Sequence, residues 1–110
     1  MLKIFQIVDD YDPAKPSAEQ SPKWHARREA IFGDDIAASW AAGYYSHVAN
    51  VATDDKEEAF EIMNLWTPKC EAKVTRLAPL HSLSVGDVVV DEAGIAHYVD
   101  RFGYKPVEVQ

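Results

Sequence analysis

The chain has 110 residues, of which 47% are hydrophobic, and its 18 acidic and 11 basic residues give a formal net charge of −7. A chain of this size is long enough for one hydrophobic core and too short for two, so we predict a single domain over residues 1–110. The negative charge opposes binding to nucleic-acid phosphates and to anionic membranes, and no apolar run approaches the ~20 residues that span a bilayer.

The first predicted element is a strand over residues 2–8, LKIFQIV. Apolar side chains fall on both of its faces, which is typical of a strand in the centre of a sheet. The stretch 9–22 that follows is acidic, polar and proline-bearing, and we predict a flexible exposed loop there.

Two short helices are predicted after this loop. The Ser21-Pro22 pair is a good helix start, because serine caps the first turn and proline suits the first helical position. It predicts a helix over residues 23–32. A second helix is expected over residues 36–42, with Asp34 and Asp35 placed to cap it.

A strand over residues 44–52 precedes the clearest amphipathic helix, residues 54–66. Thr53 or Asp54 is expected to cap this helix, and Asp54 with Glu57 forms a capping-box arrangement. Apolar side chains recur at helical spacing on one side: Ala59, Ile62, Met63 and Trp66. Carboxylates are equally regular on the opposite side: Asp54, Glu57, Glu58 and Glu61. The acidic side is either a solvated helix face or part of an acidic docking surface.

The last third of the chain predicts strands joined by tight turns. A strand over residues 72–77 leads to a hairpin whose strands are expected at residues 88–90 and 95–102. The final extended stretch, residues 104–109, contains Pro106, which cannot donate to a ladder and therefore favours the edge of a sheet. An exposed edge there would allow a homodimer.

Together these elements predict an α+β fold. We expect a single domain with a largely antiparallel sheet of four to five strands, two to three helices on one face, and a C-terminal hairpin or meander. A hairpin alone is only marginally stable, so the rest of the chain must cover one face of it.

Polar residues flank the predicted hairpin. Ser82, Ser84 and Asp87 are residue types that bond nearby backbone groups in turns, so we expect them to cap a turn; a polar site is the alternative. Asp100 and Arg101 lie at a strand end, where a solvated ion pair is expected and a functional pair is the alternative.

Two pieces of this region resemble a known family. Residues 82–88, SLSVGDV, and residues 97–104, HYVDRFGY, resemble the C-terminal signature of small proteins of bacteriophages and plasmids. These include the YodL-like domains, whose ends read roughly S-x-S-V-G/S-D-V and then Y-Y-V-D-x-F-G-F. His97 stands where a second aromatic residue is common, and Tyr104 stands where phenylalanine is common. Residues 45–64 resemble an upstream strand–helix unit of the same proteins more weakly. The resemblance implies a phage or mobile-element protein in the cytoplasm of a host bacterium, and it implies no reaction.

Residue patterns typical of catalysis or cofactor binding do not occur in the sequence. The four histidines are widely spread, and none has a second ligand at the spacing of a metal motif. Cys70, the one cysteine, excludes an internal disulfide, fits a reducing cytoplasm and has no nucleophile signature around it. There is no glycine-rich phosphate loop and no G-x-S-x-G elbow. We therefore predict a binding protein with no catalytic residue, metal or cofactor.

The leading hypothesis is a small acidic, non-enzymatic accessory protein of a phage or mobile element that binds and modulates a host protein with a basic surface. In its most specific form, the carboxylates stand in for DNA phosphates and inhibit a defence or nucleic-acid enzyme. The partner-binding residues are then Asp54, Glu57, Glu58, Glu61, Asp34 and Asp35, with Asp9, Asp10 and Asp12 as further carboxylates.

Two alternatives use other residues. A small enzyme or ligand-binding domain would use a pocket between helix and sheet, with candidates His47, His97, Tyr98 and Asp100. A nucleic-acid-binding module would stack bases on Tyr44, Tyr45, Tyr98 and Tyr104. The net charge argues against direct nucleic-acid binding.

Overall fold

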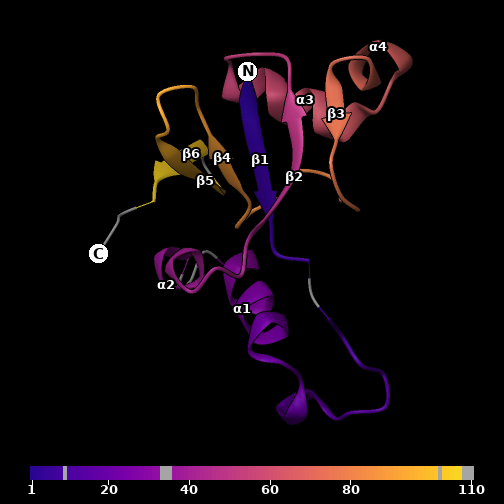
Figure 1. Cartoon of the computed structure of the whole chain (residues 1–110), viewed down its shortest axis with the longest axis vertical. Coiled ribbons are helices and arrows are strands. Elements are labelled where there is room, and N and C mark those ends of the chain that lie inside the picture. Colours follow the sequence, from indigo (N-terminus) through magenta and orange to yellow (C-terminus); the bar gives the residue numbers. More distant parts are fainter. Residues whose placement is uncertain (9, 33–35, 102, 108–110) are drawn as a thin grey trace.

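The computed structural model describes residues 1–8, 10–32, 36–101 and 103–107. Within these residues, six antiparallel strands form one sheet in the order β3-β2-β1-β4-β5-β6 (Figure 1). The strands are β1 (Leu2–Gln6), β2 (Ser46–Val51), β3 (Val74–Arg76), β4 (Val88–Val90), β5 (Ala96–Asp100) and β6 (Gly103–Pro106). The helices in the same part of the chain are α1 (Pro22–Ile31), α2 (Ile36–Ala41), α3 (Lys56–Leu65), α4 (Pro68–Glu71) and the short 3-10 helix η1 (Ser17–Glu19).

Strand β1 lies in the centre of the sheet, as its apolar pattern predicts. It pairs with β2 on one side and with β4 on the other, antiparallel in both cases. Leu2 and Ile4 are fully buried in one hydrophobic cluster, whereas Phe5 and Ile7 contribute to a second. The register of the pairing with β2 shifts between Ile4 and Phe5, where the side chains change cluster. Both faces of β1 are therefore covered by other parts of the molecule.

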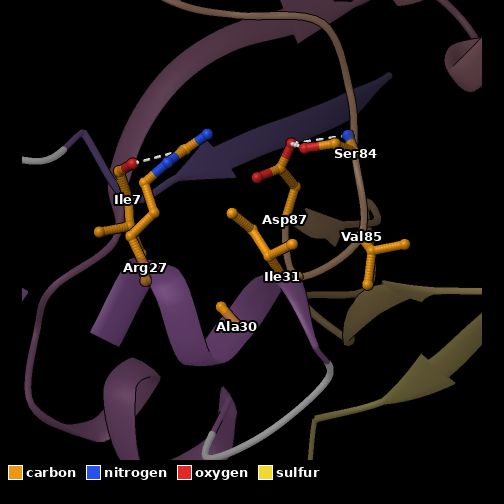
Figure 2. A pocket seen from close by; sticks show the side chains of 8 residues that line it. Ile7, Arg27, Ala30, Ile31, Ser84, Val85 and Asp87 are labelled. Carbon is orange, nitrogen blue, oxygen red and sulfur yellow. Dashed lines mark hydrogen bonds between the residues drawn. The ribbon is translucent and has the colours of Figure 1, made fainter. Parts of the chain in front are cut away.

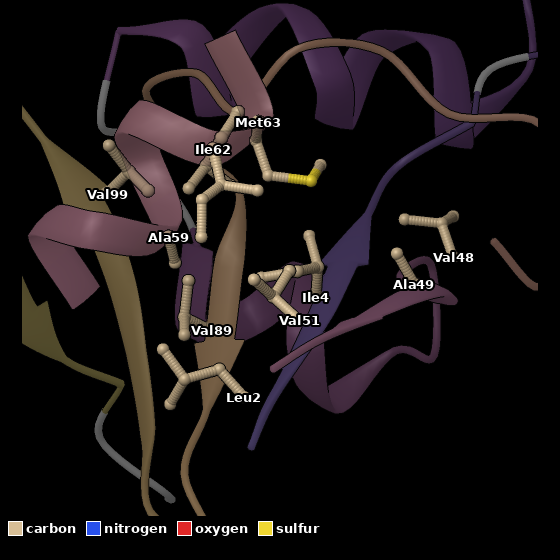
Figure 3. Packing of buried hydrophobic residues seen from close by; sticks show 11 residues of the cluster. Leu2, Ile4, Val48, Ala49, Val51, Ala59, Ile62, Met63, Val89 and Val99 are labelled. Carbon is tan, nitrogen blue, oxygen red and sulfur yellow. The ribbon is translucent and has the colours of Figure 1, made fainter. Parts of the chain in front are cut away.

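Helix α3 covers one face of the sheet through the first cluster. Ala59, Ile62 and Met63 of α3 pack with Ile4 of β1 and Val89 of β4 (Figure 3). Burying an aliphatic side chain contributes roughly 1.5–3 kcal/mol relative to leaving it exposed. The predicted apolar side of this helix is thus the surface that holds it on the sheet.

Helices α1 and α2 pack through the second cluster, which contains Ala26, Ala30 and Ile36. Strand β4 shows why two clusters form. Val89 belongs to the first cluster and Val88 to the second, because successive side chains of a strand point to opposite faces. A run of apolar residues on one strand therefore requires cover on both sides of the sheet.

The predicted α+β class is confirmed, with differences in detail. In the described residues the sheet has six strands rather than four to five, because the final extended stretch pairs with β5 as β6. The same residues contain four α-helices rather than two to three, and these pack against both faces rather than one. Helix α4 was not predicted. Thr67 accepts a hydrogen bond from Cys70 N at 3.2 Å and Pro68 fills its first position, which is the same start that Ser21-Pro22 gives to α1.

The predicted C-terminal hairpin is confirmed, as is the position of Pro106 in an edge strand. The turn between β4 and β5 closes through a hydrogen bond from Gly94 N to Asp91 O at 3.0 Å. Gly94 has a φ of 81°, a left-handed conformation that glycine adopts without strain. Gly33 directly follows the predicted helix over residues 23–32, where a glycine is expected to end it, and this residue lies outside the described ones.

The segment 10–21 reaches away from the sheet between β1 and α1 (Figure 1). Gln20 is 6% exposed and ties the segment together. Its side chain donates to Asp12 O at 2.7 Å and to Lys15 O at 3.0 Å, and it accepts from Asp12 N at 3.0 Å. This polar stretch is therefore internally hydrogen-bonded, and its flexibility stays a prediction.

Candidate functional site

Helix α3 begins at Lys56, two residues after the predicted start at residue 54. Its N-cap is Asp55, whose Oδ1 accepts from Glu57 N at 2.9 Å, so the prediction of Thr53 or Asp54 as cap is wrong. Asp54 instead accepts from the Met1 amino group at 2.5 Å, and its side chain is 82% exposed. A capping carboxylate has to reach the first unpaired N–H groups of the helix. The Asp55 carboxylate does so, whereas the Asp54 carboxylate pairs with the Met1 amino group.

The predicted carboxylates Asp54, Glu57, Glu58 and Glu61 form what we call the acidic stripe of α3. Glu57 and Glu61 are exposed, and Glu58 is half-buried. Lys73 Nζ lies 3.1 Å from Glu58 Oε1, and since both side chains are more than 40% exposed the pair contributes little stability. Asp34 and Asp35, the other two predicted partner-binding residues, lie outside the described residues.

An open groove of about 600 Å³ separates α3 from α4, and we call it the α3–α4 groove. Glu58 and Glu61 line it from α3, and Lys69 and Lys73 line it from the chain that follows. Leu65, which is 60% exposed, also lines the groove. The groove therefore combines carboxylates, an exposed apolar side chain and two lysines.

The acidic residues do not form one continuous surface. The segment 10–21 occupies one end of the longest axis of the molecule, and α3 lies toward the other end (Figure 1). Asp10 in that segment accepts a hydrogen bond from the Ser21 hydroxyl, which lowers the pKa of Asp10. Carboxylates that the sequence suggested as one set are thus divided between two separate places.

A second concentration of polar groups is buried where the turn before β4 meets β1. Asp87 is 4% exposed, and its Oδ2 accepts from Ser84 N at 2.9 Å (Figure 2). The same oxygen accepts from Gln6 Nε2 at 3.1 Å. Gln6 also donates to His81 O at 2.8 Å and accepts from His81 N at 3.1 Å. Asp87 therefore caps the turn as predicted, and through Gln6 it also joins the turn to the central strand, which the sequence did not indicate.

Arg27 of α1 closes this polar cluster. Its Nη1 donates to Ile7 O at 2.8 Å (Figure 2) and lies 2.6 Å from His81 Nε2. Because a guanidinium can only donate, Nε2 must accept, and the ring proton sits on Nδ1, 2.7 Å from Ser82 O. The cavity beside Arg27 and Asp87 has a volume of about 10 Å³, which is room for one water molecule. The cluster therefore connects helix α1 to the sheet, and its cavity has no room for a ligand larger than water.

A comparison with known protein families assigns the family of this chain. A family model described as the YodL-like domain matches residues 29–109. The chain belongs to the YodL-like domain family. No curated protein and no solved structure matches the chain. The matched region of this YodL-like domain contains α3 and the turn at Asp87, whereas β1 and most of α1 precede it.

The residues that a pocket-based activity would use are not gathered in this YodL-like domain. His47 Nε2 lies 2.7 Å from Asn50 Oδ1, and Tyr98 packs against the second hydrophobic cluster. His97 Nδ1 is buried and has no hydrogen-bond partner among the described residues. Asp100 alone of the four lines one of the larger hollows, at the connection between β5 and β6. The structure thus does not bring these candidates together.

The tyrosines of the nucleic-acid alternative serve packing. The Tyr45 hydroxyl donates to Gly86 O, and burial raises the pKa of Tyr45. The Tyr104 hydroxyl donates to Lys56 O at 2.7 Å. The other two tyrosines of the set pack against the second hydrophobic cluster. These rings are therefore at least partly occupied by contacts within the protein.

Within the described part of the chain, no group of three or more His, Cys, Asp or Glu side chains is placed to hold a metal ion. None of the helices described is long and apolar enough to cross a membrane.

The buried Asp87 predicts a pH dependence of stability. Burial raises the pKa of Asp87 from its ordinary value of 3.8 to about 7, against the opposing effects of the hydrogen bonds from Ser84 and Gln6 and the charge of Arg27. The folded state then binds the proton more tightly than the unfolded state. The resulting stabilisation is complete below pH 3.8 and is lost as the pH rises to about 7. One pKa unit corresponds to about 1.4 kcal/mol, so this group contributes ~4 kcal/mol at most.

Asp87→Asn is expected to remove this slope, because the amide does not titrate. Urea unfolding of wild type and variant between pH 4.5 and 7.5, at steps of about half a pH unit, measures it. Asp91→Asn is the control, since the Asp91 carboxylate bonds Ile95 N at the surface and should leave the slope unchanged. An equal slope in Asp87→Asn and wild type would contradict the assignment.

Proposed function

We propose that this YodL-like domain acts without catalysis, by stoichiometric binding of a protein with a basic surface, and that α3 is its docking surface. The observation that supports the proposal is the coincidence of the acidic stripe with the α3–α4 groove. Glu58 and Glu61 line this groove together with the exposed Leu65. A partner with basic and apolar side chains would complement both properties.

The charge of the chain supports fast, salt-sensitive association. With a net charge of −7, the molecule attracts basic surfaces at a distance, and the stripe provides a local focus for them. Charged side chains at the rim of an interface act mainly on the association rate, whereas a desolvated apolar anchor acts on the lifetime of the complex. We assign the first role to the carboxylates and the second to Leu65.

The setting is part of the proposal. Family membership, together with the resemblance of residues 82–104 to phage and plasmid proteins, supports an accessory protein of a phage or mobile element that modulates a host protein in the bacterial cytoplasm. Imitation of DNA would require one long acidic surface. Since the segment 10–21 and α3 lie toward opposite ends of the molecule, we restrict the proposed contact to α3.

Neutralising the acidic side of α3 is the test. The triple variant Glu57→Gln, Glu58→Gln and Glu61→Gln should lose at least about tenfold in affinity for the partner captured from a bacterial lysate, because steering and local attraction are both removed. Binding by the wild type should weaken strongly when the salt is raised from ~0.05 M to ~0.5 M, since screening shortens the reach of surface charges.

A variant with the same change in charge is the control. Glu19→Gln, Glu29→Gln and Glu92→Gln remove three carboxylates outside α3, and this protein should bind nearly as well as the wild type. Binding that survives the α3 substitutions, or that both triple variants weaken equally, contradicts α3 as the docking surface. Capture that does not depend on salt contradicts the electrostatic mechanism.

A further inference from the structure

A second hollow, of about 310 Å³, lies between α3 and the connection of β5 with β6, and Glu57 lines both this hollow and the α3–α4 groove. We call this second hollow the β5–β6 hollow. Glu57 and Phe60 line it from α3, and Asp100, Arg101, Gly103 and Tyr104 line it from the hairpin. Its volume is at the lower end of the ~300–1,000 Å³ that ligand pockets occupy, which is enough for one long side chain.

Two of its walls are aromatic. The hydroxyl of Tyr104 donates to Lys56 O at 2.7 Å, so the ring is held against the first turn of α3. Burial and the nearby carboxylates of Glu57 and Asp55 raise the pKa of Tyr104 to about 12, so the phenol stays neutral. Phe60 lies one helical turn after Glu57 and is 42% exposed, so its ring is offered on the same side of the helix as that carboxylate.

Carboxylates flank these rings. Glu57 is exposed, and Asp100 Oδ2 lies 3.4 Å from Lys105 Nζ, with the Asp100 side chain 19% exposed. Gly103 borders open space, since a Cβ atom at this position would meet nothing within 4 Å. The hollow therefore presents aromatic faces and carboxylates to whatever enters it.

We propose that the β5–β6 hollow binds one arginine side chain of a protein partner. The planar guanidinium would stack on the Phe60 ring and donate to the carboxylates of Glu57 and Asp100. Arginine fits better than lysine because its flat, weakly hydrated group pairs with carboxylates through two parallel hydrogen bonds and stacks on aromatic faces. The proposal deepens the proposed function by naming the side chain that anchors the basic partner.

Arg101 is the one cation among the residues that line this hollow, and Lys105 Nζ lies 3.4 Å from the Asp100 carboxylate at its edge. Both positive charges oppose further cations, so the hollow favours an isolated arginine, which shares Asp100 with Lys105, over a run of basic residues. Arg101→Gln should accordingly tighten arginine binding by about twofold, because a like charge near the site is removed.

The test uses the full chain and a defined probe, the tripeptide acetyl-Gly-Arg-Gly-amide. In an NMR titration of the ¹⁵N-labelled protein, amide signals of α3 and of the β5–β6 connection should shift and saturate. The matching peptide with citrulline, which has nearly the same shape but no charge, should not shift them. Glu57→Gln and Phe60→Ala should each weaken arginine binding by about fivefold, since each removes one of the contacts.

Glu61→Gln is the matched control. It changes the charge of the same helix by the same amount, but Glu61 lines the α3–α4 groove and not the β5–β6 hollow. Arginine binding should be unchanged in this variant. Absence of a saturable shift, equal shifts with citrulline, or an equal loss in Glu57→Gln and Glu61→Gln would overturn the proposal. The proposed function has its own test, because the triple variant of α3 can lose the partner whether or not the tripeptide binds.

Discussion

Gly86→Ala is expected to destabilise the protein by about 2–5 kcal/mol, the largest effect of a single small substitution that the structure predicts. Gly86 has a φ of 92°, and a Cβ atom there would lie 2.4 Å from Ala30 O in α1. The turn cannot easily move away, because Gly86 N donates to Val99 O at 2.9 Å. The added methyl group therefore has to push α1 off the sheet or break the turn.

Gly94→Ala separates the two causes of this loss. Gly94 has a similar φ of 81°, but a Cβ atom at that position would meet nothing within 4 Å. It should cost only the conformational strain, about 1–2 kcal/mol. Urea unfolding of both variants gives the difference, which measures the contact between Gly86 and Ala30. If both variants lose the same free energy of unfolding, the contact between residue 86 and Ala30 adds nothing to the cost of the substitution.

Deletion of residues 1–28 is expected to abolish cooperative folding, although it leaves the region matched by the family model intact. The deletion removes β1, which lies between β2 and β4, and most of α1. Leu2 and Ile4 leave the first hydrophobic cluster with it. Strands β2 and β4 would then both lose β1, the strand with which each of them pairs. The two remaining groups of strands would be only marginally stable without that pairing. Circular dichroism and the dispersion of NMR amide signals measure the outcome.

Shortening the exposed loop is the control for this deletion. Replacing residues 13–19 by two glycines removes η1 but keeps β1 and α1, and Asp12 and Gln20 already lie within hydrogen-bond distance. This variant should unfold cooperatively, with a modest change in stability. If the fragment 29–110 folds cooperatively by itself, β1 is not essential and the folding unit coincides with the family match.

The elements that the sequence predicted well depend on contacts between near neighbours. The acidic and apolar sides of α3 follow from helical spacing, and the cap, predicted at Thr53 or Asp54, was misplaced by one or two residues. The hairpin follows from its valine run and from the turn that ends at Gly94. Helix α4 was missed although Thr67 and Pro68 carry the same start signal as α1, because the helix has only four residues and no periodic pattern to accompany the signal.

The sites, in contrast, join distant parts of the chain. Asp87 has the residue type of a turn cap, which the sequence showed, but its partner Gln6 lies at the other end of the chain. Gln6, a polar residue between Phe5 and Ile7 in the predicted central strand, was the one available signal that a buried polar partner was needed. The β5–β6 hollow likewise combines Glu57 and Phe60 with residues of the hairpin far along the sequence.

The sequence by itself thus determined the α+β class, the amphipathic character of α3, the hairpin and the acidity of the molecule. The tertiary structure alone decided that β1 lies between β2 and β4, that helices cover both faces of the sheet, and that the acidic segment 10–21 lies far from the carboxylates of α3. The physical reason is that periodicity and turn chemistry act over a few residues. Strand order and side-chain neighbours arise instead from burying the apolar surfaces of the whole chain at once.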